Sequence, residues 1–203
     1  RDTVISANDF GTATVDGNLL ADCAENCRVL QINNPVLSSR DLMKIEGLHM
    51  PGLQAKKVSL LYYKNSSLAL ALDRLFVACD KAYYAGANIL ILSDRGVDEN
   101  HIAIPSLLAV SAVQQYLVRT KKRTAISIIL ESAEPRDVHH FATLFGYGAS
   151  AVNPYLAQDC IGELIAGGAL NKDYYAAVDA YNKAILDGVM RIASKMGISS
   201  MQS

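Results

Sequence analysis

Between residues 56 and 157 the chain alternates short apolar runs with longer segments in which apolar residues recur every three or four positions. The long segments are typical of helices with one buried face, and the short runs are typical of strands. The second and third runs are apolar almost throughout, as expected of strands covered on both faces. The predicted strands are Lys57–Tyr63, Asn88–Ser93, Thr124–Leu130 and Ala149–Asn153.

Capping residues place the predicted helices between these strands. A helix is expected from about Leu68 to Tyr83, because Asn65-Ser66-Ser67 offers side-chain acceptors for its first N–H groups and Gly86 suits a left-handed end. Proline marks the start of the next segments, because its missing N–H costs nothing in a first helical turn. Helices begin near Pro105 and Pro135, Pro154 opens a helix or a turn, and a long final helix is expected over residues 173–195.

Alternating strands and helices predict an α/β fold of parallel strand–helix repeats with a long C-terminal helix. Four such units are half of an eight-stranded β/α barrel. The pattern therefore favours an open sheet or a truncated, barrel-like arrangement over a closed barrel.

Residues 1–55 differ from the rest because glycine, proline and asparagine divide them into short segments. We expect helices over Leu19–Leu30 and just after Ser38 or Ser39. We interpret 1–55 as an irregular, helical lead-in and 56–203 as the α/β domain, with its C-terminal part truncated relative to a longer parent. The first residue is Arg1 rather than Met, which suggests a fragment or a processed form.

The composition and charge of the chain bear on the kinds of partner that it binds. The 203 residues are 51% hydrophobic and 19% charged with a formal net charge of -1, which gives no indication of a nucleic-acid or membrane partner. No apolar run approaches the length of a membrane helix. The cysteines at 23, 27, 79 and 160 are expected to be reduced thiols of a cytoplasmic protein, with Cys79 a small buried hydrophobe.

Polar residues gather where the predicted strands end, which is where parallel sheets bind ligands. Asp94 and Glu131 are candidates for acid and base, and Arg95 is a candidate for holding a carboxylate or phosphate. The alternative, which we favour, is an ion-pair network that joins neighbouring loops. The full set at the strand ends is Ser93, Asp94, Arg95, Glu131, Ser132 and Asn153.

Other candidate chemistry is weak. His139 and His140 are adjacent, so on a helix they point about 100° apart and do not suit one metal ion; a structural, hydrogen-bonded histidine is the better interpretation. Cys23 and Cys27 lie one helical turn apart but supply too few ligands for a structural metal site. The glycines in Gly146-Tyr-Gly148 precede a strand and lack phosphate-loop spacing. We therefore assign no catalytic, cofactor-binding or metal residue.

Three longer segments of the sequence, taken together, indicate a resemblance to a known family. Gly86-Ala-Asn-Ile-Leu-Ile-Leu-Ser-Asp-Arg-Gly96, Val138-His-His-Phe-Ala142 and Ala151-Val-Asn-Pro-Tyr-Leu-Ala157 resemble, in the same order, the central domain of the glutamate synthase large subunit. The resemblance covers most of residues 30–203. It departs at Gln114-Gln115-Tyr116, where the family commonly shows a histidine cluster, and at Ala133, where glycine is frequent.

The resemblance implies a parent that converts glutamine and 2-oxoglutarate to two glutamates with electrons from NAD(P)H or ferredoxin. It also implies an amidotransferase domain and an FMN-binding barrel with an iron–sulfur cluster in the same polypeptide, and a reductase subunit or ferredoxin as a further partner. The central domain would link these regions as a non-catalytic scaffold.

Two alternatives stay open. One is a stand-alone small α/β enzyme or binding module in which Asp94, Arg95 and Glu131 surround a carboxylate or phosphate. The other is an interaction module whose residues 1–55 dock on a separate partner.

Overall fold

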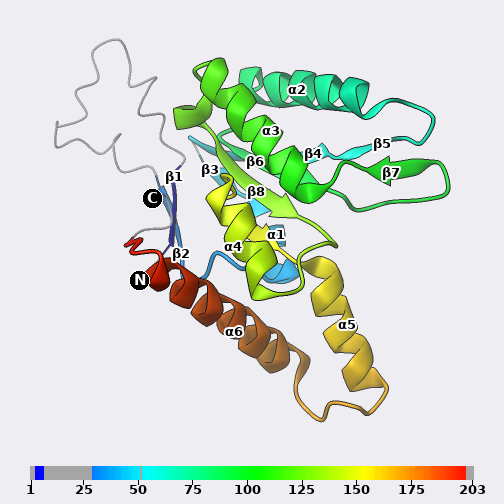
Figure 1. The fold of residues 1–203 in the computed structure, drawn as a ribbon, viewed down its shortest axis with the longest axis vertical. Coiled ribbons are helices and arrows are strands. Elements are labelled where there is room, and N and C mark those ends of the chain that lie inside the picture. Colours follow the sequence, from blue (N-terminus) through cyan, green and yellow to red (C-terminus); the bar gives the residue numbers. More distant parts are fainter. Residues whose placement is uncertain (1–2, 7–28, 51, 200–203) are drawn as a thin grey trace.

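The computed structural model describes residues 3–6, 29–50 and 52–199. Within these residues the chain is an α/β fold centred on one mixed sheet with the strand order β3-β4-β6-β8-β9 (Figure 1). The strands are β3 (His49–Met50), β4 (Leu53–Ser59), β6 (Ile89–Ser93), β8 (Ser127–Glu131) and β9 (Ala151–Asn153). The predicted α/β class is confirmed, in its open-sheet form.

Four of these strands run parallel, as the strand–helix alternation predicts. Strand β3 is antiparallel and pairs only with the first two residues of β4. The register aligns the last residues of the four parallel strands, so that all four strand ends lie at one edge of the sheet. These residues are Ser59, Ser93, Glu131 and Asn153.

One face of the sheet is covered by α2 (Leu68–Tyr84), α3 (Ser106–Arg119) and α4 (Val138–Gly146) (Figure 1). Their buried stripes meet alternate strand residues in the larger core, which includes Leu90, Leu92 and Ile128. These three side chains have no solvent exposure, which agrees with strands buried on both faces. Ser67 caps α2 by accepting from the Leu70 N–H, and the left-handed Gly86 follows that helix, both as predicted.

The other face carries a smaller core built by α1 (Ser39–Glu46). Leu42 and Ile45 of α1 pack with Ile89 and Ile91, which point to the opposite side from Leu90 and Leu92. Segment 35–37 also joins the sheet, because Leu37 N–H donates to the Val152 carbonyl and Val152 N–H donates to the Pro35 carbonyl. The edge of the sheet at β9 is therefore partly covered by residues that precede the sheet in sequence.

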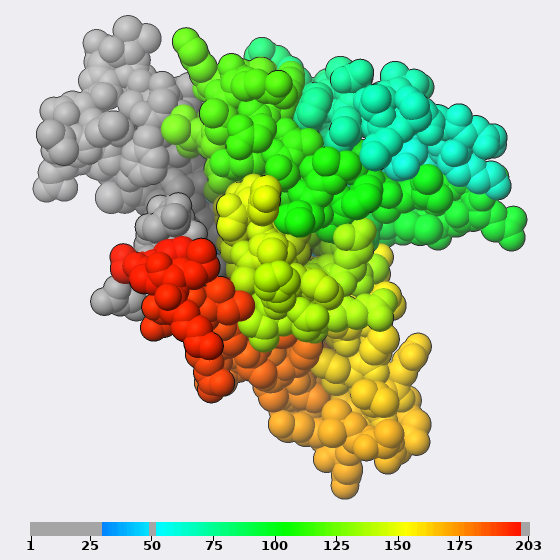
Figure 2. Space-filling view, viewed as in Figure 1, coloured from blue at the N-terminus to red at the C-terminus, as the bar shows by residue number. Residues whose placement is uncertain are grey.

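The chain leaves the sheet through α5 (Tyr155–Ala166) and the long α6 (Tyr174–Lys195). Helix α6 packs on α4 and α5, and α5 with the first half of α6 projects from the body as an arm (Figure 2). The predicted C-terminal helix is confirmed within one residue at its start. No helix in the described part of the chain has the length and apolar character needed to span a membrane.

Two pairings were not expected from the sequence. Strand β5 (Leu61–Tyr63) pairs with β7 (His101–Ala103), so the predicted strand 57–63 is divided at Leu60. Strand β1 (Thr3–Ser6) pairs with β2 (Val29–Ile32), so the predicted helix Leu19–Leu30 is wrong at its last two residues. Its remainder lies outside the described residues. A short 3-10 turn, η2 (Arg123–Ala125), replaces the predicted start of β8.

Candidate functional site at the strand ends

Glu131 is the centre of the charged group at the carboxyl edge of the sheet. It is the last residue of β8, and only 3% of its surface is exposed. Its Oε1 accepts from Arg95 Nε at 2.6 Å, and its Oε2 accepts from Ser93 Oγ at 2.5 Å and pairs with Lys57 Nζ at 3.0 Å. Three side chains from β4, β6 and the following loop therefore hold one buried carboxylate.

The titration of Glu131 follows from these contacts. Burial alone would raise its pKa, but the hydrogen bonds from Ser93, Arg95 and Lys57 outweigh burial and lower the pKa below its ordinary value. Glu131 is therefore held as an anion at neutral pH, which does not suit a general acid. Both of its oxygens are already engaged.

Lys57 links this carboxylate to α1, which covers the face of the sheet on which both side chains lie. Its Nζ also lies 2.7 Å from Oε1 of Glu46, the last residue of α1. Burial would lower the pKa of Lys57, yet its bonds to Glu46 and Glu131 raise the pKa overall. Lys57 therefore stays charged and joins α1 to the strand ends.

Asp94 forms a second buried group on the neighbouring loop. Its Oδ2 accepts from Ser132 Oγ at 2.6 Å and from the Ala133 N–H at 3.0 Å. The Tyr155 hydroxyl also donates to it, and burial together with this contact raises the pKa of Tyr155. The carboxylate of Asp94 thus fastens the loops after β6 and β8 to the start of α5.

Arg95 and Tyr155 join the two carboxylate groups. The guanidinium of Arg95 lies 3.8 Å from the centre of the Tyr155 ring while its Nε donates to Glu131. Ser132 extends the network to α3, because its Oγ lies 2.5 Å from that of Ser106, whose N–H donates to Glu134.

Asn153 belongs to a different polar cluster beneath α5. Its Nδ2 donates to the Leu37 carbonyl at 3.0 Å, and Gln158 Nε2 donates to the same oxygen at 2.9 Å. Gln158 Oε1 accepts from the Ser39 N–H, and its amide also reaches Asn182 of α6. This cluster ties the segment before α1 to β9, α5 and α6.

The structure thus brings together all six residues of the predicted set, but in three groups rather than around one space. Sequence reasoning missed Lys57, Ser106, Tyr155, Gln158 and Asn182. The visible signal for Gln158 was a polar residue one turn after Pro154, directly after the apolar Leu156 and Ala157. Nothing in the local sequence indicated that Lys57 would reach Glu131.

The remaining candidates have structural contacts. His140 Nδ1 accepts from the Arg136 N–H, while Asp137 accepts from the N–H groups of His139 and His140 at the start of α4. Cys79 is fully buried, and burial raises the pKa of its thiol to about 12. Cys23 and Cys27 lie outside the described residues. No set of three metal-binding side chains occurs in the described ranges.

Comparison with known proteins identifies the family. A sequence model of the family described as the glutamate synthase central domain matches residues 4–203. The chain belongs to this family. It is 43% identical over 188 residues to the glutamate synthase [NADPH] large chain of Bacillus subtilis, covering 93% of this chain and 12% of that protein.

Two further relatives have the same kind of coverage. Ferredoxin-dependent glutamate synthase 2 of Synechocystis is 37% identical over 203 residues, covering 92% of this chain and 13% of that protein. Ferredoxin-dependent glutamate synthase 1, chloroplastic/mitochondrial, of Arabidopsis thaliana is 36% identical over 202 residues, with 92% and 12% covered. The chain therefore spans about an eighth of the length of these relatives.

Two residues of α3 that differ from the usual glutamate synthase central domain sequence, Gln114 and Tyr116, make packing contacts in this chain. Gln114 accepts a hydrogen bond from Arg123 Nε. Tyr116 donates to Asp80 Oδ2 at 2.8 Å and stacks on Phe76 with ring centres 4.4 Å apart. Both lie on α3, away from the strand ends.

Proposed function

We propose that this chain is the non-catalytic link of a glutamate synthase, holding the glutamine-hydrolysing and glutamate-forming regions of one polypeptide in fixed relation. The observation that carries the proposal is that the charged side chains at the strand ends are bonded within the domain. Arg95 binds Glu131 and lies against the Tyr155 ring, and the Asp94 carboxylate binds Ser132 and Ala133. Such saturated contacts support rigidity, because each buried charge has its partner inside the domain.

A fixed relation matters because ammonia released at one site must reach the other before it enters water. The domain spans about an eighth of its relatives, so both active regions would lie in the remaining polypeptide. We place FMN, the iron–sulfur cluster and the contact with NAD(P)H or ferredoxin there too. Arg95, the strand-end cation suited to a flavin phosphate, is already bonded to Glu131, which supports this placement. A cytoplasmic location stays a proposal, since one relative is named chloroplastic/mitochondrial.

The test replaces residues 30–199 of the complete polypeptide with a flexible Gly/Ser linker and compares it with the unaltered enzyme. The readout is the ratio of glutamine hydrolysed to 2-oxoglutarate consumed, measured with free ammonia in the medium. We expect this ratio to rise above one and ammonia to accumulate. Unchanged one-to-one coupling after the replacement would refute the proposal.

A binding role for Arg95 makes a different prediction in the isolated chain. It requires saturable binding of 2-oxoglutarate or inorganic phosphate that Arg95→Ala abolishes. The link proposal expects no such binding, and expects Arg95→Ala to lower the midpoint of urea unfolding. Calorimetric titration and urea denaturation of the same two samples separate the roles.

A further inference from the structure

The outer side of β4 is an open sheet edge. Pairing with β3 ends at Gln54, and in the described residues no strand pairs with 55–59 on that side. The Asn88 N–H donates to the Gln54 carbonyl and the Leu60 N–H donates to Ser93, so even-numbered residues direct their backbone groups to β6. The backbone groups of Ala55, Lys57 and Ser59 therefore face outward, because successive residues of a strand alternate between its two sides.

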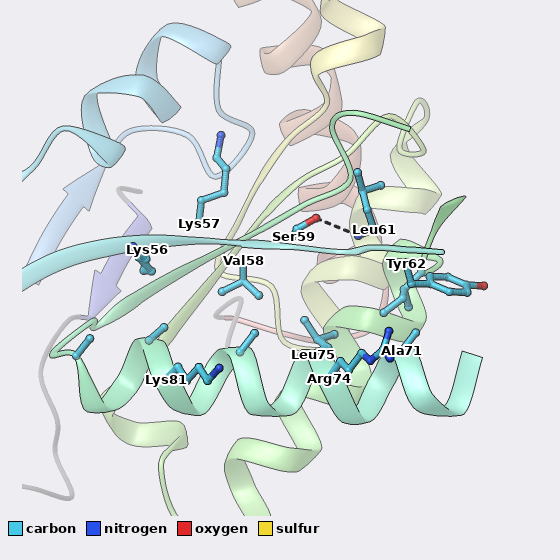
Figure 3. Close-up of a pocket in the computed structure, with 14 residues that line it drawn as sticks. Lys56, Lys57, Val58, Ser59, Leu61, Tyr62, Ala71, Arg74, Leu75 and Lys81 are labelled. Carbon is cyan, nitrogen blue, oxygen red and sulfur yellow. Dashed lines mark hydrogen bonds between the residues drawn. The ribbon is translucent and has the colours of Figure 1, made fainter. Parts of the chain in front are cut away.

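Helix α2 extends beyond this edge and forms a groove with it. The cavity measures about 440 Å³, and its apolar floor includes Val58 of β4 and Leu75, Ala78 and Ala82 of α2. Figure 3 shows Val58 pointing toward α2, whereas Lys57 points to the other side of the strand. A strand placed on this edge would bury every second side chain beneath α2.

The groove is positively charged. Lys56, Arg74 and Lys81 line it, and none of its lining residues is acidic. Lys57 also lines it, but its ammonium lies on the other side of the strand, with Glu46 and Glu131. The structure gives Lys56, Arg74 and Lys81 no hydrogen bond or ion pair with any described residue, and all three are exposed. Two acids lie outside this lining: Glu46 binds Lys57, and Asp73 lines the adjoining outer groove.

The exposed surface of α2 continues the apolar character of the groove. Leu70 is 43% exposed and Val77 is 54% exposed, and both lie in a second hollow that shares Arg74, Ala78 and Lys81 with the first. Apolar side chains on a helix that overhangs an unpaired strand are expected where another element completes the layer.

We propose that an extended, acidic segment from elsewhere in the same glutamate synthase polypeptide adds as a strand to the open edge of β4. Open backbone groups select an extended segment, the apolar floor selects alternate apolar residues, and Lys56, Arg74 and Lys81 select carboxylates between them. A segment of about five residues would cover positions 55–59. The inference rests on the proposed function, because it places the domain inside a longer chain.

The experiment places a photoreactive benzoylphenylalanine at Val77 of the complete polypeptide. After illumination, mass spectrometry identifies the cross-linked segment. We expect a cross-link within the same polypeptide to a segment that alternates apolar and acidic residues. No cross-link, a cross-link between two copies, or a cross-link to a basic or helical segment would overturn the proposal.

Charge reversal tests the recognition itself. The pair K56E and R74E should lower the Val77 cross-link about fivefold, equal to about 1 kcal/mol, while K56Q and R74Q should lower it less. Cross-linking from Met43, an exposed residue of α1, serves as the control and should not change. Equal cross-linking in all charge variants would overturn the acidic assignment, and unaltered melting temperatures confirm that the variants fold.

The coupling ratio of glutamine hydrolysis to 2-oxoglutarate consumption is measured on the same samples. A missing cross-link with intact coupling overturns the docking alone. If the cross-link forms but the unaltered enzyme already releases ammonia into water, the linking function alone is overturned.

Discussion

Arg95 Nε donates to Oε1 of Glu131 at 2.6 Å, and this bond joins the loop after β6 to the last residue of β8. The acceptor is almost fully buried, whereas 42% of the Arg95 side chain is exposed. An ion pair with one exposed member is screened, so its main effect is to satisfy a carboxylate that would otherwise be buried alone. The same reasoning applies to Lys57, whose side chain is 39% exposed.

The first prediction concerns removal of this buried charge. Glu131→Gln leaves Arg95 without its carboxylate and Lys57 with Glu46 alone. We expect a loss of about 2 kcal/mol in the free energy of unfolding, below the range for fully buried pairs because both cations are partly exposed. Urea denaturation at pH 7 measures it. The matched control is Glu46→Gln, at a carboxylate 33% exposed, for which we expect less than about 1 kcal/mol.

The second prediction is a pH dependence. The folded-state pKa of Glu131 is lowered from the ordinary value of 4.5. A carboxyl group whose pKa is lowered by folding stabilises the fold at a pH above its unfolded-state pKa. This contribution is lost as the pH falls through the folded-state pKa. The stability difference between wild type and Glu131→Gln should therefore be constant from pH 6 to 7 and shrink below pH 4.5. A difference that grows on acidification would contradict the assignment.

How much of this could be predicted from sequence depends on the range of the contacts. Strand and helix periodicity placed β6, α2 and α6 within about a residue or two, because each is set by its own apolar pattern. The strand-end position of Glu131 followed from the parallel topology alone. The separation of Asp94 and Asn153 into different clusters did not, because it depends on which side chains fold over them.

Gln158 shows why the missed residues were hidden. Its partners Leu37 and Ser39 lie more than a hundred residues earlier, so no local pattern connects them. Lys57 was equally hidden, because alternation along β4 gives the face of its side chain but not the neighbour there. Long-range polar contacts of this kind are decided by the assembled fold.

The third prediction tests the cluster around Gln158. Gln158→Leu removes the acceptor of the Ser39 N–H and the donors to Leu37 and Asn182. We expect a loss of about 2–3 kcal/mol, because several buried polar groups lose partners. Hydrogen exchange should also accelerate at Ser39. The control is Gln115→Leu on the exposed side of α3, expected within about 0.5 kcal/mol of wild type. Equal effects at both positions would exclude a specific role for the cluster.

The fourth prediction concerns the contact that holds α6 against α4. A Cβ at Gly188 would lie 2.7 Å from Val138 Cγ1 and closer still to Cγ2, whereas Val138 Cβ is farther away, at 3.2 Å. Gly188→Ala should therefore cost about 1 kcal/mol net, because overpacking of about 1–3 kcal/mol exceeds the gain in helix propensity of about 1 kcal/mol. In a Val138→Ala background both γ carbons are gone, and the same change should stabilise the fold. Urea denaturation of the four proteins measures the sign reversal, and a loss of similar size in both backgrounds would show that α6 does not pack on α4 at this point.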